Sequence, residues 1–357
     1  MKIKVSELIV KYMERLGIET IFGMPGAHIL PVYDSLYDSG IESILAKHEQ
    51  GAAFMACGYA KASGRISACI TTAGPGATNL VTGIANAFAD KQPILIITGE
   101  TSTTIFGKGG LQESSGEGGS IDQGELFRSI TRYSKLIERT DYLAQVLNQA
   151  SKILLSANPG PVLLSLPFNV QKELVDADIL RNIKTKRHVY AVDKNSPPVD
   201  ALAQQISEAK HPVILAGYGC IKSGAQDIVS QLSKSLNIPV ATSLKGKGVI
   251  GDASELSLGS LGVTSDGRAY RYIVQQADMV LFLGAGFNER TSYLWDQKIL
   301  RNKKVAQIDS DPAQLEKVFE ADVAIQGDIK EVLTGVLGNL TEKGIAKKEL
   351  NGMRNHN

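Results

Sequence analysis

Apolar positions in the first half of the chain alternate between helical spacing and short unbroken runs. Residues 5–16 place apolar side chains three and four positions apart and stop at Gly17, which predicts an amphipathic helix. Residues 93–98, PILIIT, are apolar throughout, as in a strand buried on both faces of a parallel sheet. The same patterns predict further helices over 29–37, 49–63, 77–89 and 142–156 and further strands over 18–22, 44–46, 67–72 and 161–166. Such alternation predicts a parallel sheet with helices on both faces.

The alternation breaks once and then starts again. Residues 173–197 are charged and contain proline, which indicates a linker. Beyond it, the pattern predicts helices over 199–208, 225–236 and 329–340 and strands over 212–216, 239–242, 278–283 and 304–308. We therefore expect an α/β protein with two doubly wound parallel-sheet domains, at 1–172 and 198–341, followed by a polar tail at 342–357.

Charge and cysteine content narrow the classes of function. The 357 residues carry 38 Lys and Arg against 37 Asp and Glu, a net charge of +1 with no basic block, so neither nucleic acid nor a membrane surface is expected as a partner. Three cysteines without a CxxC pair argue against a disulfide scaffold or structural zinc and favour a reducing compartment. The N-terminus is charged throughout, unlike a signal peptide, and no apolar run reaches the ~20 residues that span a bilayer. These features predict a cytoplasmic protein.

Four segments of the first half follow predicted strands, and the carboxyl ends of parallel strands are where such sheets bind ligands. They are FGMPGAH at 22–28, KHEQGAA at 47–53, TTAGPGATN at 71–79 and LQE at 111–113. Taken singly, each has a structural explanation. Pro25-Gly26 can be a turn, Glu49 an acid favoured at a helix N-terminus, and Gly74-Pro75-Gly76 a tight connection that lacks the lysine of a phosphate-binding loop. Their occurrence at successive strand ends favours a binding site.

These segments resemble those of thiamine-diphosphate-dependent enzymes, in particular the catalytic large subunit of acetolactate synthases. The second half is similar to the central domain of that family in KHPVILAGYGCIKSGA, NIPVATSLKGKGVI, GSLGVTS, LGAGFNER and QIDSDPAQL. The resemblance runs from about residue 4 to about residue 340 and implies a pyrimidine-binding domain followed by a central domain.

The resemblance also implies roles for individual residues. Glu49 stands where the family keeps the carboxylate that hydrogen-bonds N1′ of the aminopyrimidine and so activates the cofactor, and Gln112 matches a glutamine near the reacting centre. Two residues, Pro25 and Gly26, are expected to approach the cofactor ring. The adjacent wall of the cofactor site is expected to consist of Thr72, Pro75, Gly76 and Asn79.

The chain also departs from the family pattern. The Gly-Asp-Gly motif and following Asn that hold Mg²⁺ and the diphosphate are absent, since Gly251-Asp252 and Gly327-Asp328 lack the flanking glycine and the spacing. We therefore expect no metal ligand in this chain. A separate subunit with a diphosphate-binding domain is expected to hold Mg²⁺ and the diphosphate of thiamine diphosphate. The assembly is also expected to contain more than one copy of this chain.

Further departures concern substrate and flavin. Ala27 and His28 replace the usual small pair after Pro-Gly, and His28 is either a substrate or acid–base group or a turn residue. A glycine-rich insertion at 114–124 is expected near the mouth of the site, and the loop over 107–124 is expected to order only when partner and substrate are present. The family's flavin-contacting arginine is replaced by Gly286, which leaves either FAD, another adenine-containing ligand or no ligand in the central domain.

These observations predict one component of a split thiamine-diphosphate enzyme that decarboxylates or carboligates 2-keto acids. The alternative is a non-catalytic relic that regulates or binds a full-length synthase. A nucleotide-binding module resting on the central domain alone would leave the four segments of the first half unexplained.

Overall fold

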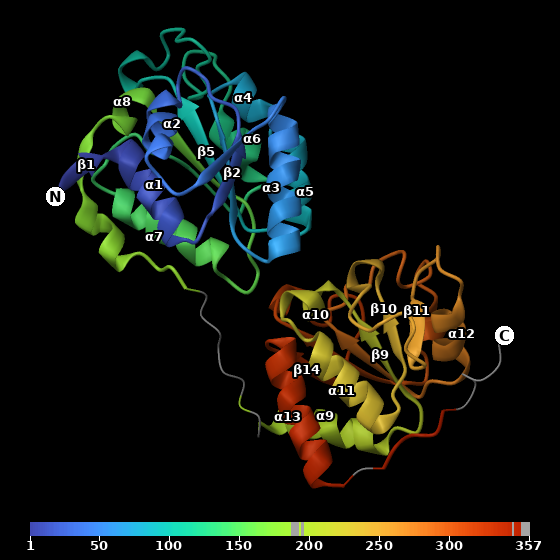
Figure 1. Ribbon diagram of the computed structural model, residues 1–357. Helices are drawn as coiled ribbons and strands as arrows, with labels where there is room; N and C mark the ends of the chain where they lie inside the picture. Colours follow the sequence, from blue (N-terminus) through green and yellow to red (C-terminus); the bar gives the residue numbers. More distant parts are fainter. Residues whose placement is uncertain (187–192, 194–195, 345, 351–357) are drawn as a thin grey trace. The chain divides into compact units, whose positions relative to one another are not determined.

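The computed structural model describes residues 1–186, 193, 196–344 and 346–350 (Figure 1). The chain divides into two compact units, Met1–His188 and Val189–Asn357. The end of the predicted linker, and most of the second half of the predicted polar tail, lie outside the described residues. Each unit has its own sheet and core, so each is an α/β domain with a parallel sheet, as predicted.

The first unit contains six parallel strands in the order β3-β2-β4-β5-β7-β6. The strands are β2 (Thr20–Gly23), β3 (Glu42–Leu45), β4 (Ser67–Thr71), β5 (Ile94–Glu100), β6 (Tyr133–Leu136) and β7 (Val162–Pro167). The chain moves from β2 outward to β3 and returns to β4 on the other side of β2. The strand order therefore reverses between β2 and β4, which is the position where such sheets bind ligands.

Helices cover both faces of this sheet, because successive side chains of each strand point to opposite faces. Ile21, Ile70 and Leu95 belong to the core under α1 (Val5–Arg15), α2 (Leu30–Tyr37) and α7 (Leu143–Leu154). Phe22 and Cys69 belong to the core under α3 (Glu49–Ser63), α5 (Val81–Ala89) and α6 (Gln123–Arg128). Figure 1 shows the two helical layers on either side of the strands.

Several elements of the first unit carry no clear sequence pattern. β1 (Lys2–Lys4) pairs antiparallel with β8 (Leu174–Asp176), and η2 (Ala177–Asn182) contributes Leu180 to the core. The first part of the predicted linker therefore belongs to the first unit. The helix predicted over 77–89 is divided into α4 (Pro75–Thr78) and α5. Two short helices complete the unit, η1 (Thr103–Ile105) and α8 (Phe168–Gln171).

The second unit repeats the architecture with strand order β11-β10-β9-β12-β13-β14, again all parallel. Its strands are β9 (Pro212–Ala216), β10 (Val240–Thr242), β11 (Ser257–Ser260), β12 (Met279–Leu283), β13 (Lys304–Asp309) and β14 (Val323–Gln326). Its helices are α9 (Pro197–Glu208), α10 (Tyr218–Lys222), α11 (Gln226–Leu236), α12 (Arg268–Gln275), α13 (Ile329–Glu342) and the short η3 (Leu244–Gly246), η4 (Gln297–Ile299) and η5 (Pro312–Gln314).

The two faces of the second sheet are covered differently. α9, α11 and α13 pack on one face, whereas the opposite face is covered by α12 and by aromatic side chains such as Phe287 and Phe319. Across the residues that the structure describes, no helix is both long enough and apolar enough to span a membrane. All three cysteines are buried free thiols, as expected without a disulfide scaffold.

Candidate functional site

The turns after β2 and β4 meet at the point where the strand order reverses. A Cβ added to Gly26 would lie 2.6 Å from Cβ of Thr72 and 2.8 Å from its Cγ2. Gly26 is therefore required by the protein's own packing, because any side chain there would overlap Thr72. From the sequence, Gly26 is expected to approach the cofactor ring, and that role stays a prediction. The packing against Thr72 is by itself a sufficient reason for glycine at this position.

Glu49 opens α3 beside this turn. His48 caps the helix, with its Nδ1 accepting a hydrogen bond of 3.1 Å from the backbone N–H of Gln50. The Glu49 side chain is only 9% exposed, and its Oε2 accepts a hydrogen bond of 2.9 Å from Nδ2 of Asn79. A carboxyl group at a helix N-terminus is also favoured by the helix dipole, so the structural explanation for Glu49 applies here.

Gly76 lies between Thr72 and Glu49. A Cβ added there would lie 2.7 Å from Oγ1 of Thr71, 2.8 Å from Cγ2 of Thr72 and 3.6 Å from Oε1 of Glu49. Oγ1 of Thr71 is buried and has no hydrogen-bond partner among the described residues. The lack of a side chain at Gly76 thus leaves the free oxygen of Glu49 and the hydroxyl of Thr71 close together.

Gln112 reaches the same corner from the loop after β5. Its Oε1 lies 3.3 Å from Oγ1 of Thr72, in a hydrogen bond that the threonine donates. Its backbone has φ of +54°, a left-handed conformation that non-glycine residues rarely adopt. Gly74 faces it closely, since a Cβ on Gly74 would lie 3.0 Å from the carbonyl oxygen of Gln112.

The structure thus connects most of the predicted residues in one series. Contacts run from Gln112 through Thr72 and Gly76 to Glu49 and Asn79, with Gly26 behind Thr72. Pro25 and Pro75 are exposed, and Pro75 is joined to this series by its carbonyl oxygen, which accepts a hydrogen bond of 3.1 Å from the N–H of Asn79. Pro75 occupies the first turn of α4, where a residue without an N–H is well accommodated.

His28 is buried next to Thr72 and over the end of β5. Its N–H donates to Oγ1 of Thr72 at 3.4 Å, and its carbonyl oxygen accepts a hydrogen bond of 2.6 Å from Nε2 of Gln171. A Cβ on Gly99 would lie 2.8 Å from Cβ of His28. Nδ1 of His28 and Oε1 of Gln171 are both buried without a partner among the described residues. Buried polar atoms of this kind are normally satisfied, which indicates a place for water or a ligand group.

Sequence reasoning missed a second polar cluster at the ends of β5 and β7. Glu100 is fully buried, and its carboxyl oxygens accept hydrogen bonds from Thr101 and Ser114. Gln123 lies next to Ser114 and donates to Oγ1 of Thr98 at 2.7 Å and to Oγ of Ser165 at 3.2 Å. The signal available in the sequence was a glutamate two positions after the apolar run at 93–98, at the end of β5.

Two kinds of environment change the pKa of side chains near the site. The N–H of Gly107 and the hydroxyl of Ser115 bind the carboxylate of Glu113, which lowers the pKa of that carboxyl group. Burial raises the pKa of the Cys69 thiol and of the Tyr33 hydroxyl, which donates to the carbonyl oxygen of Ile70. Glu113 is therefore held as an anion, whereas Cys69 and Tyr33 are held neutral and serve the core.

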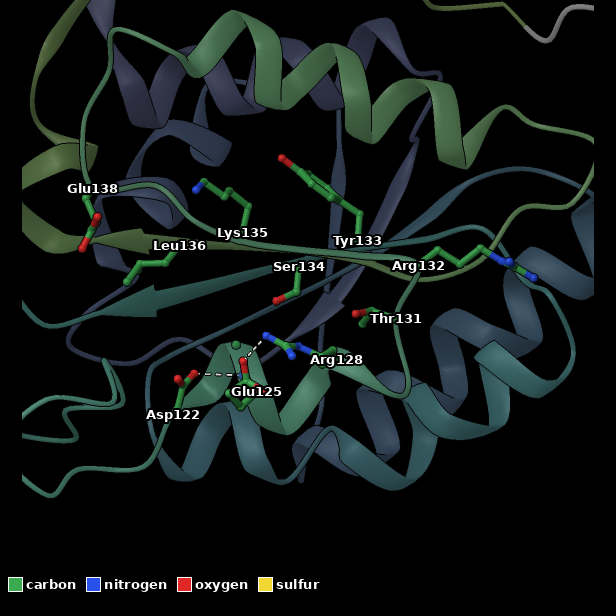
Figure 2. A pocket seen from close by; sticks show the side chains of 11 residues that line it. Asp122, Glu125, Arg128, Thr131, Arg132, Tyr133, Ser134, Lys135, Leu136 and Glu138 are labelled. Atoms are coloured by element: carbon green, nitrogen blue, oxygen red, sulfur yellow. Dashed lines mark hydrogen bonds and ion pairs between the residues drawn. The ribbon is translucent and has the colours of Figure 1, made fainter.

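A pocket of about 470 Å³ lies between α6 and the edge strand β6, apart from the predicted residues (Figure 2). Ser134 points toward α6, whereas Tyr133 and Lys135 point to the other face of the strand (Figure 2). The cations around the pocket already have partners. Arg128 pairs with Glu125, Arg132 donates to Asn158, and Lys135 lies 5.2 Å from the ring centroid of Tyr142. None of the predicted site residues lines this pocket.

Glycines also gather where the strand order of the second unit reverses, at the ends of β9 and β12. A Cβ on Gly217 would lie 2.2 Å from the carbonyl oxygen of Gly284, and one on Gly284 would lie 2.5 Å from Cα of Gly219. These glycines are explained by close packing of two chain segments and do not by themselves indicate a phosphate site. Among the described residues, no group of three or more His, Cys, Asp or Glu side chains could hold a metal ion.

Comparison with known proteins shows the family of the chain. Residues 3–120 match the N-terminal TPP binding domain of thiamine pyrophosphate enzymes, and residues 199–336 match their central domain. The probable acetolactate synthase large subunit of Methanocaldococcus jannaschii is 37% identical over 350 residues, which cover 97% of this chain and 58% of that protein. The acetolactate synthase isozyme 1 large subunit of Escherichia coli K12 is 37% identical over 93% of this chain and 57% of its own length.

A third relative shows the same relation. The acetolactate synthase large subunit of Lactococcus lactis is 36% identical over 93% of this chain and 56% of its own length. The chain thus spans a little over half the length of the relatives it matches. With both family domains matched and the predicted residues assembled at one edge of the first sheet, the chain belongs to the thiamine pyrophosphate enzymes.

Proposed function

We propose that this chain supplies the aminopyrimidine-binding half of a thiamine diphosphate site, in an enzyme that decarboxylates or carboligates 2-keto acids as acetolactate synthases do. The observation that carries the proposal is the arrangement of Glu49. Asn79 holds one carboxyl oxygen, while the other, Oε1, makes no hydrogen bond within the described residues and lies beside Gly76.

The residues present fit the cofactor's aminopyrimidine ring. A carboxyl oxygen without a partner can share a proton with a ring nitrogen, and the buried hydroxyl of Thr71 can bind a ring substituent. When bound, thiamine diphosphate supplies the nucleophile that breaks and forms carbon–carbon bonds at the keto carbon. In this proposal Glu49 holds and returns the proton at Oε1, Asn79 keeps the carboxyl plane fixed, and the Thr72–Gln112 pair presents polar atoms to the reacting centre.

We further propose that a partner subunit holds Mg²⁺ and the diphosphate group. The support is which family domains the chain matches, since residues 3–120 and 199–336 match the N-terminal and central domains and the chain spans a little over half the length of its relatives. Two copies of this chain with two of the partner form the simplest closed arrangement with complete sites. For the second unit, FAD, another adenine-containing ligand and no ligand stay the alternatives, and the visible absorbance of the purified protein tests the first. A cytoplasmic location stays a prediction.

His28 is proposed to contact the 2-keto acid substrate. Nδ1 of His28 and Oε1 of Gln171 are both buried without a hydrogen-bond partner among the described residues, which favours this role over that of a turn residue. His28→Asn is then expected to raise KM for the keto acid at least several-fold, because an amide keeps polarity but not the reach of the imidazole. Unchanged KM and kcat would identify His28 as a turn residue.

Reconstitution tests the proposed function. The chain is mixed with a polypeptide carrying the Gly-Asp-Gly motif, and CO₂ release from pyruvate is measured with thiamine diphosphate and Mg²⁺. We expect turnover only in the mixture, and a loss of at least 100-fold for Glu49→Gln, since an amide cannot exchange the proton. The matched control is Glu42→Gln, an exposed position on β3, which should retain activity.

The result also separates the alternatives. Calorimetry should show weak or no binding of thiamine diphosphate to the chain alone, because the charge-assisted diphosphate contacts are missing. Assembly with a full-length synthase without turnover would support the non-catalytic relic. Wild-type turnover by Glu49→Gln would refute the role of the carboxyl group.

A further inference from the structure

We propose that Glu100 is a positioning residue that holds Gln112 in its left-handed conformation against Thr72. The buried cluster around Glu100 is outside the residues assigned above, yet one of its members, Ser114, lies two positions along the chain from Gln112. The link to catalysis rests on the proposed function, whereas the anchoring itself can be measured without cofactor or partner.

The Glu100 carboxyl group joins two chain segments at the end of β5. Its Oε1 accepts hydrogen bonds of 2.8 Å from the N–H of Thr101 and 3.1 Å from the N–H of Ser114. Its Oε2 accepts the hydroxyl proton of Ser114. Within the described residues these partners are all uncharged, so the carboxyl group acts here as a set of hydrogen-bond acceptors rather than as half of an ion pair.

Ser114 is the centre of the cluster. Its Oγ contacts Glu100, lies 3.2 Å from Oε1 of Gln123 and accepts a hydrogen bond of 3.4 Å from the N–H of Gly74. Gln123 begins α6 and is itself bonded to β5 and β7 through Thr98 and Ser165. One serine therefore ties the loop to three elements of the sheet edge.

Gln112 needs such support because its backbone is strained. A left-handed residue other than glycine persists only where its surroundings impose the conformation. Glu113 restrains the preceding part of the loop by accepting hydrogen bonds from Gly107 and, at 3.0 Å, from Gly110. Glu100 restrains the following part through Ser114. Gln112 lies between these two carboxyl groups, and its Oε1 is thereby kept within 3.3 Å of Oγ1 of Thr72.

These hydrogen bonds add to the expected behaviour of the glycine-rich loop. The sequence predicts that residues 107–124 order only with partner and substrate, and this stays a prediction. The start of the loop also has restraints from two carboxyl groups of the same chain. The glycines provide close packing, as at Gly118, where a Cβ would lie 2.5 Å from the carbonyl oxygen of Gly107.

Two substitutions separate positioning from acid–base chemistry. In Glu100→Gln the amide oxygen can still accept hydrogen bonds from the backbone N–H groups of Thr101 and Ser114. The amide nitrogen can donate to Oγ of Ser114, and the Ser114 hydroxyl then donates to Oε1 of Gln123. Glu100→Ala removes every one of these bonds. A positioning role is therefore rescued by glutamine, whereas a role that needs a titrating carboxyl group is not.

The test is amide hydrogen exchange of the full chain, read by mass spectrometry on peptides covering residues 101–115. We expect at least tenfold faster exchange for Glu100→Ala and Ser114→Ala, and a change within twofold for Glu100→Gln. Ser67→Ala is the matched control, since it removes another buried bond of the same sheet, 2.8 Å from Ser67 Oγ to the carbonyl oxygen of Ala56. It should leave these peptides within twofold of the unmodified chain.

A second background tests the link to Gln112. When Gln112→Gly removes the backbone strain, Glu100→Ala should accelerate exchange less than threefold, compared with at least tenfold in the original background. An equal effect in both backgrounds, or unchanged exchange in Ser114→Ala, would overturn the proposal. If Glu100→Ala fails to fold, Ser114→Ala in the two backgrounds gives the same comparison. Failure of this test leaves the assignment of Glu49 intact, because exchange is measured without cofactor.

Discussion

Asn79 donates a hydrogen bond of 2.9 Å to the Glu49 carboxyl group, and the two residues are thirty positions apart in the chain. The bond joins the first turn of α3 to the end of α4 and leaves one oxygen of Glu49 beside Gly76. It fixes the orientation of a carboxyl group that is only 9% exposed, and the proposed proton exchange depends on that orientation.

Substitutions of Asn79 test this bond. Asn79→Ala should lower the free energy of unfolding by about 1 kcal/mol, because Glu49 loses its donor. Asn79→Asp should lower the free energy of unfolding further, by about 1–3 kcal/mol in total, because the new carboxylate faces that of Glu49. Urea unfolding at pH 7 measures both. Equal stability of the two variants would show that the side chain of residue 79 does not act on Glu49.

Glycine-to-alanine substitutions should have opposite signs at two positions. Gly26→Ala overlaps Thr72 and should destabilise the chain by about 1–3 kcal/mol. Gly58→Ala, in the middle of α3 with open space around the added carbon, should stabilise it by about 0.5–1 kcal/mol. Thermal unfolding of both variants checks the prediction. A tolerated Gly26→Ala would contradict the contact between the turns after β2 and β4.

Gln112→Gly should raise stability although it removes a side chain. Glycine adopts the φ of +54° without strain, and the expected gain is about 0.5–1 kcal/mol after the greater freedom of the unfolded chain is counted. Gln112→Ala keeps the strain and loses the Thr72 contact, so it should not stabilise. The denaturant midpoints of Gln112→Gly and Gln112→Ala measure the difference. Equal midpoints would mean that the backbone of residue 112 is not strained.

The loop around Glu113 should loosen at low pH. Its pKa is lowered below the ordinary value of 4.5 by the N–H of Gly107 and then by the hydroxyl of Ser115. The stabilisation is therefore fully present above pH 4.5 and is lost as the pH falls through the lowered pKa. NMR titration should show the Gly107 amide shifting with the same midpoint as the Glu113 carboxyl carbon. In Glu113→Gln this transition should vanish, and its persistence would assign it to another group.

Local signals in the sequence were sufficient for much of the fold. The predicted helix over 49–63 agrees with α3 at both ends, because His48 and Glu49 favour its start and Gly64, with φ of +71°, ends it. The buried strands β5 and β9 were recognisable as unbroken apolar runs. Because parallel strands end at a common edge, their order along the chain also indicated where a site would form.

Other features arose only from contacts between distant residues. β6 is a half-buried edge strand without an apolar run, and β1 exists only because it pairs with β8 at the other end of the unit. The bond from Asn79 to Glu49 and the cluster around Glu100 likewise depend on which strand ends become neighbours. The sequence alone determined most of the elements and the edge that carries the candidate site, whereas tertiary packing decided the remaining strands and which side chains meet at that edge. The physical reason is that hydrophobic periodicity is local, while the burial that pairs polar groups depends on the whole sheet.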